Sequence, residues 1–119
     1  MRFVSTPARD ELRARVREFL ADASPSAEVR RLMESDRGYD PDVWQAIVAA
    51  GWLDLPFADL AVVLEEAGAA LLCAPLLGTA VARQVVGDGE GIVALALAED
   101  SGRWEAEAAT LRAAPTANG

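Results

Sequence analysis

Apolar residues recur at helical spacing in the first part of the chain. Four of them fall at positions i, i+4, i+7 and i+8 and so share one face of a helix: Leu12, Val16, Phe19 and Leu20. Thr6 and Pro7 precede this stripe, where a side-chain cap and a proline at the first helical position are favoured. The pattern therefore predicts a helix that begins at Pro7 and ends at Ser24-Pro25-Ser26.

Four further segments have the same spacing, and each is predicted to be a helix. A short helix follows the first one. The next begins after the capping residue Asp40 and ends at Gly51, another begins at about Phe57, and the last runs from Pro75 towards Val86. The apolar residues expected to face the core in the first three of these are Val29, Leu32, Met33, Val43, Trp44, Ile47, Val48, Leu60, Val63, Leu64, Ala67 and Leu71.

The connection between the helices that end at Gly51 and begin at Phe57 is short, because it consists only of residues 52–56. Glycine fits the left-handed conformation that commonly ends a helix, and the residue just beyond it can fold back onto the last turn. We therefore expect Trp52 to be buried and these five residues to be sufficient for a turn.

The apolar period changes after Gly87 to Gly91, which is expected to be a loop. Large and small side chains alternate from Ile92 to Ala98, which predicts a strand that is apolar on both faces. A short helix remains the alternative, because Ala and Leu favour helix. Its ladder partner in a hairpin is expected between Trp104 and Leu111. The fold class is accordingly mainly α, a small bundle of about five helices (domain 1–90) followed by a short β-strand or hairpin (domain 91–119).

Composition excludes several classes of function. The formal net charge is −8, so the protein repels nucleic acids and anionic membrane surfaces, and neither is expected as a partner. The sequence contains no His, and all 11 basic residues are Arg. Histidine-based catalytic pairs and lysine Schiff bases are therefore excluded within this chain. The N-terminus has no apolar run typical of a signal peptide, so we expect a soluble, cytoplasmic protein.

Adjacent carboxylates at Glu65 and Glu66 suggest acid–base chemistry at first sight. Neighbouring residues on a helix point about 100° apart, however, and do not converge on one substrate atom. A solvated helix face is the interpretation that this pattern favours for both side chains.

Other candidate sites are also better explained as structure. The aspartates between residues 36 and 42 lack the spacing of a calcium loop. The segment Gly87 to Gly91 contains two acids and would repel a phosphate. Cys73 lies in an apolar run with no basic neighbour, which favours a buried structural thiol. The residues alone therefore predict no catalytic residues and no metal site.

Several segments, in this order, resemble the N-terminal region of the flavin-dependent acyl-CoA dehydrogenase family. The stretch DELRARVREFLAD at residues 10–22 is similar to the first helix of the family, and GYDPDVWQAIVAAGWLDL at residues 38–55 is similar to its W-x-x-(L/I)-x-x-x-G-W-L stretch. FADLAVVLEEAGAALLCAPLLGTAVA at residues 57–82 resembles a helix pair with E-E-x-G and an A-P-L-L turn. LALAEDSGRWE at residues 95–105 resembles the start of the middle β-domain. The resemblance covers roughly residues 8 to 112.

The sequence departs from the family pattern in three places. The segment Gly87 to Gly91 stands where the family has a longer, helix-containing stretch. A glycine-rich loop usually follows the G-W-L stretch, whereas here Pro56 is followed at once by a helix. In the motif that opens the β-domain, Ala98 stands where Thr is usual, Asp100 where Pro is usual and Arg103 where Gly is usual, while Glu99 is retained. In the family this strand and turn contact the flavin, in part through the Thr hydroxyl, which Ala98 cannot supply.

The resemblance implies a truncated acyl-CoA dehydrogenase-like protein associated with FAD-dependent α,β-dehydrogenation of acyl-CoA thioesters. It implies FAD as cofactor, with Leu97 and Ala98 as cofactor-binding residues, and an acyl-CoA substrate near the region from Val63 to Leu77. The family's catalytic Glu would lie beyond Gly119, so no catalytic residue is assigned and the chain alone is expected to be inactive. The alternatives are a non-enzymatic helical interaction module, or a regulatory subunit that completes the acyl-binding site of a partner subunit carrying the remaining domains.

Overall fold

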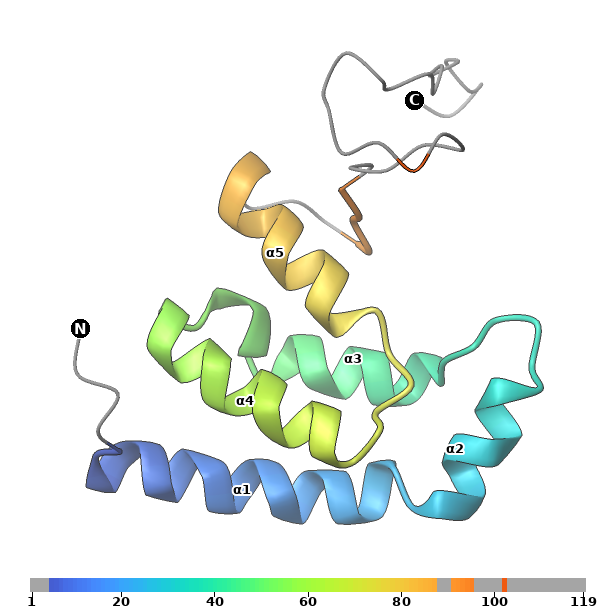
Figure 1. The fold of residues 1–119 in the computed structure, drawn as a ribbon, viewed down its shortest axis with the longest axis horizontal. Coiled ribbons are helices and arrows are strands. Elements are labelled where there is room, and N and C mark those ends of the chain that lie inside the picture. Colours follow the sequence, from blue (N-terminus) through green and yellow to red (C-terminus); the bar gives the residue numbers. More distant parts are fainter. Residues whose placement is uncertain (1–4, 88–90, 96–101, 103–119) are drawn as a thin grey trace.

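The computed structural model describes residues 5–87, 91–95 and 102, and within them the chain is helical. Helices α1 and α4 lie side by side, α2 turns away from the end of α1, and α5 projects from the layer that α1, α3 and α4 form (Figure 1). The elements are α1 (Pro7–Ala23), α2 (Ser26–Met33), α3 (Pro41–Ala49), the 3-10 helix η1 (Trp52–Asp54), α4 (Phe57–Ala69) and α5 (Leu76–Val86).

Two of the predicted helix starts are confirmed in detail. The hydroxyl of Thr6 accepts a hydrogen bond from the backbone N–H of Arg9 at 3.3 Å, and a proline occupies the first helical position of α1. At the start of α3, the carboxylate of Asp40 accepts from the N–H groups of Asp42 and Val43 at 2.8 and 3.3 Å. Local sequence signals therefore fix both helix N-termini.

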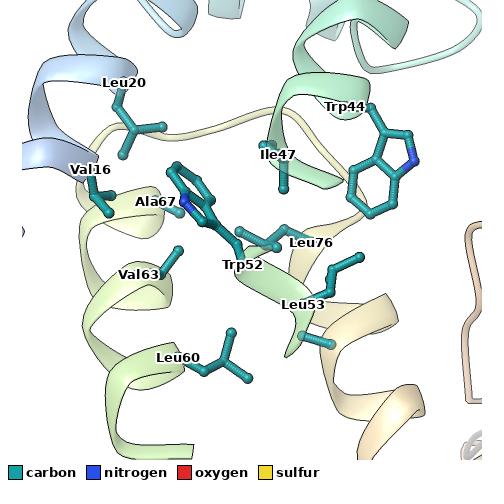
Figure 2. Packing of buried hydrophobic residues seen from close by; sticks show 11 residues of the cluster. Val16, Leu20, Trp44, Ile47, Trp52, Leu53, Leu60, Val63, Ala67 and Leu76 are labelled. Carbon is teal, nitrogen blue, oxygen red and sulfur yellow. The ribbon is translucent and has the colours of Figure 1, made fainter. Parts of the chain in front are cut away.

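The hydrophobic core lies between α1, α3, η1, α4 and the start of α5 (Figure 2). Ile47, Val63 and Ala80 have no exposed surface, and Val16 is 1% exposed. The first apolar stripe is confirmed, because Val16 and Leu20 of α1 are buried and its other two members pack against them. Burial of this apolar surface is the main stabilising contribution in such a bundle.

The turn after α3 follows the prediction. Gly51 has φ +69°, the left-handed conformation that glycine adopts most readily, and η1 begins at the next residue. The indole of Trp52 is 6% exposed and meets the ring of Phe19 edge-on, with ring centroids 5.1 Å apart. Helix α4 then begins at Phe57, so residues 52–56 complete the connection.

Three residues expected in the core are exposed instead. Met33 is 74% exposed because it ends the short helix α2, of which only Val29 and Leu32 are buried. Leu71 is 69% exposed: α4 ends at Ala69 and Leu71 has φ +51°, so the helical spacing no longer applies to it. Val48, near the end of α3, is 38% exposed.

The mainly α fold class with five helices is confirmed in the described residues, whereas the strand is not. Ile92 to Leu95 form no strand, and the backbone N–H of Val93 donates to the hydroxyl of Thr79 at 3.3 Å. This contact brings the segment back beside α5. The rest of the predicted strand, residues 96–98, and its proposed partner at residues 104–111 lie outside the described residues.

Candidate functional site

Glu66 is buried, which corrects the expectation of a solvated face for both adjacent glutamates. Its side chain is 6% exposed, whereas that of Glu65 is 66% exposed. Arg17 of α1 donates to both carboxylate oxygens of Glu66, from Nε at 2.6 Å and from Nη2 at 3.1 Å. Arg13 donates from Nη1 to the same carboxylate. The burial of Glu66 is possible because two guanidinium groups compensate its charge.

This arrangement suits a structural role rather than catalysis. The hydrogen bonds from Arg17, with those from Arg13, hold the pKa of Glu66 below its usual range. A general base at neutral pH requires a pKa near 7, so a carboxylate held in this way is a poor proton acceptor. Arg9 adds a further ion pair to Asp59 at 2.8 Å, so charged pairs connect α1 to α4 along their length.

An apolar groove opens beside the turn between α4 and α5. It encloses about 520 Å³ between α2, the C-terminal half of α4 and the start of α5. Residues that line it include Val29, Met33, Leu64, Leu71, Cys73 and Leu77. Because Met33, Leu71 and Leu77 are 62–74% exposed, their apolar surface is available to a ligand. We call this feature the apolar groove.

A second pocket of about 610 Å³ adjoins the apolar groove and shares Val29, Met33 and Leu71 with it. Two arginines and one glutamate are its only charged lining residues in the described part of the chain, namely Arg17, Arg30 and Glu66. We call this feature the arginine pocket. The two pockets together form one surface that is apolar at the α5 end and basic at the α1 end.

Two curated proteins are similar to this chain over part of its length. An acyl-CoA dehydrogenase IpdE2 from Mycolicibacterium smegmatis is 49% identical over an alignment that covers 50% of this chain and 23% of that protein. An acyl-CoA dehydrogenase IpdE2 from Mycobacterium tuberculosis is 40% identical over 62% of this chain and 27% of that protein. The chain is related to the acyl-CoA dehydrogenase family over part of its length.

The match to these acyl-CoA dehydrogenases spans only about a quarter of the length of each relative. This similarity agrees with the resemblance seen in the sequence, and it is limited to part of the length of the related proteins. No protein-family model matches the chain, and no solved structure matches it significantly.

The structure brings together part of the region that the acyl-CoA dehydrogenase resemblance assigned to substrate. Within the segment from Val63 to Leu77, several side chains form the apolar groove, including the half-buried Cys73. Leu97 and Ala98, the residues assigned to FAD, lie outside the described residues. No helix among the described residues has both the length and the apolar character needed to cross a bilayer. The described residues also contain no group of three or more side chains able to hold a metal ion.

The lining of the apolar groove does not fit a flavin. The isoalloxazine ring of FAD needs hydrogen-bonding partners and its diphosphate needs amides or cations, whereas the apolar groove has an aliphatic lining. An unbranched hydrocarbon chain fits such a lining better, because the chain has no polar groups that need hydrogen-bonding partners.

Sequence reasoning missed the role of Glu66, although a signal was present. Glu66 follows Val63 by three residues and precedes Ala67, so it lies on the buried face of α4. Arg13 and Arg17 are four residues apart on α1 and so share one face. Together these spacings indicate a compensated carboxylate between two helices.

Proposed function

We propose that this chain forms the helical, acyl-chain-binding part of an acyl-CoA dehydrogenase-like activity. That activity is the FAD-dependent α,β-dehydrogenation of acyl-CoA thioesters, and the flavin would be held outside the described residues. The observation that carries the proposal is the 40–49% identity to two acyl-CoA dehydrogenases. The apolar groove supports it, because its aliphatic lining matches the chemistry of an acyl chain.

The groove in this proposal receives the hydrocarbon chain of the thioester. Met33 and Leu77 border it from α2 and α5, and both are largely exposed in the free protein. Covering them with an acyl chain removes apolar surface from water, at about 25 cal/mol per Å². Affinity should therefore rise with chain length.

Binding of octanoyl-CoA by the full chain tests this assignment. We expect Leu77→Ser, which alters the groove, to weaken octanoyl-CoA binding about tenfold or more, since covering an apolar side chain contributes about 1.5–3 kcal/mol. Val85→Ser is the matched control, because Val85 is 68% exposed on the same helix and does not line the groove. Isothermal titration calorimetry measures both. Equal affinity of the two variants would contradict the proposal.

A second candidate is a subunit that completes the acyl-binding site of a partner. The observation in its favour is the exposed apolar side of α5, where Val81, Val85 and Val86 are 43–68% exposed. Val93 and Leu95, which this hypothesis expected to be exposed, are half-buried. Purification with the product of a neighbouring reading frame distinguishes the two candidates. A stable complex with visible flavin absorption supports a partner subunit, and a monomer in every preparation contradicts it.

A further inference from the structure

The net charge of the residues that line the arginine pocket is opposite in sign to the net charge of the whole chain. Its charged lining residues in the described part are two arginines and one glutamate, a formal charge of +1, while the whole chain carries −8. The glutamate is Glu66, which is already compensated by Arg13 and Arg17. Arg13 and Arg17 together more than balance the charge of Glu66, and Arg30 adds a further positive charge to the lining.

Both arginines retain hydrogen-bonding capacity towards the pocket. The side chain of Arg17 is 65% exposed and uses Nε and Nη2 for Glu66, so Nη1 makes no hydrogen bond to the described residues. Arg30 is exposed and forms no ion pair with any described residue, in contrast to its neighbour Arg31, which is paired with Glu28. Guanidinium groups bind carboxylates and phosphates strongly because they offer several donors in one plane.

We propose that the two pockets together bind an amphiphile, with its anionic group at Arg17 and Arg30 and its apolar chain along the apolar groove towards Leu77. Met33 and Leu71 belong to both pockets, so one continuous surface leads from the basic end to the apolar end. The inference rests on the proposed function and adds an anion-binding part to the proposed acyl-chain site. A carboxylate on the chain and a phosphate of CoA share this chemistry.

A matched pair of ligands isolates the anionic part of this proposal. Octanoate and 1-octanol have the same chain length and differ in charge. We would titrate each into the ¹⁵N-labelled full chain and follow the backbone resonances of Val29, Met33 and Leu71 by NMR. We expect octanoate to bind about two- to fivefold more tightly than octanol, the range for an exposed ion pair.

Two variants assign the preference to the arginine pocket. Arg30→Gln removes the unpaired guanidinium, and we expect it to abolish the preference for octanoate over octanol. Arg15→Gln is the control, since Arg15 is exposed on α1, outside the lining of either pocket, and should leave the preference unchanged. Equal affinity of both ligands for the native chain, or a preference that survives Arg30→Gln, would overturn the inference.

The outcomes separate this inference from the proposed function. If both ligands shift the groove resonances with equal affinity, the anion site fails and the apolar groove stands. If neither ligand shifts them, both proposals fail. Octanoyl-CoA in the same titration identifies the source of the anion. A loss of its affinity in Arg30→Gln assigns the site to a CoA phosphate, and an unchanged affinity alongside a lost octanoate preference assigns it to a carboxylate on the chain.

Discussion

The carboxylate of Glu66 connects the first and fourth helices of this protein through charge-assisted hydrogen bonds. Glu66 is 5% exposed, and its carboxylate accepts hydrogen bonds from Arg13 and Arg17 of α1. Desolvating a carboxylate is costly, and the two guanidinium groups offset that cost. Because Arg17 remains 65% exposed, water screens part of the interaction.

Glu66→Gln should therefore destabilise the protein by about 1.5–3 kcal/mol, the range for hydrogen bonds to charged groups. Glu65→Gln is the matched control one residue away. Its side chain is 66% exposed, so its change in unfolding free energy should stay within about 0.5 kcal/mol. Urea unfolding at neutral pH measures both variants. If the two substitutions had equal effects, Glu66 would not have the structural role described above.

The lowered pKa of Glu66 gives this contribution a definite pH dependence. The stabilisation is fully present above the pKa of a Glu in the unfolded chain, about 4.3, and is lost as the pH falls through the lower pKa of the folded state. The difference in unfolding free energy between the native chain and Glu66→Gln should thus shrink below about pH 4. Urea unfolding at pH 7, 5, 4 and 3 measures it. A difference that is constant over this range would contradict the assignment.

Single residues also show where sequence reasoning was insufficient. Val16, Ile47 and Val63 were placed correctly, because each belongs to a stripe that recurs over several helical turns. Met33 and Leu71 were placed incorrectly because they lie at or beyond a helix end, where the spacing no longer fixes the direction of a side chain. The partners of Glu66 are more than 45 residues away along the chain, so local patterns could not specify them.

At the scale of elements, the connection from α3 to α4 depends on two adjacent residues. Gly51 adopts the left-handed conformation that ends α3, and Trp52 then fills the space between helices (Figure 2). Both features were predicted from the sequence, because a glycine cap and a following apolar residue form a local motif. The connection is short and the helices on both sides of it pack into one core.

Trp52→Ala should destabilise the protein by about 3–5 kcal/mol, since it removes a large buried ring and leaves a cavity against Phe19. Trp52→Phe keeps an aromatic ring in the same place and should cost less. Thermal and urea unfolding measure the two variants. A loss below about 1 kcal/mol for the alanine variant would mean that the indole is not part of the core.

The exposed side of α5 could not be assigned from the sequence. The pattern from residues 76 to 86 predicts a helix, but nearly all its residues are apolar or small, so spacing does not indicate which face is covered. The structure buries Leu76, Thr79 and Ala80 and leaves Leu77, Val81 and Val85 exposed. Only the packing of α5 against η1 decides this orientation.

At the scale of the whole molecule, the helices form a core, and the apolar groove opens directly beside it, because Ala67 and Leu76 belong to both. The region assigned to the acyl chain from the family resemblance, Val63 to Leu77, does contribute to that groove. The adjoining arginine pocket could not be predicted, because Arg17 and Arg30 belong to α1 and α2 and line one pocket only through the tertiary fold. The assignment to FAD through Leu97 and Ala98 stays a prediction.

The central claim is that the apolar groove binds an acyl chain, and Cys73 provides the most direct test of it. Cys73 is the only cysteine in the sequence and lines the groove. The rate at which iodoacetamide alkylates Cys73, followed by mass spectrometry, should fall severalfold when octanoyl-CoA is added at saturating concentration. Acetyl-CoA, which lacks the long chain and, as a thioester, has no free thiol to consume iodoacetamide, should leave the rate unchanged. Alkylation at the same rate with and without octanoyl-CoA would contradict the claim.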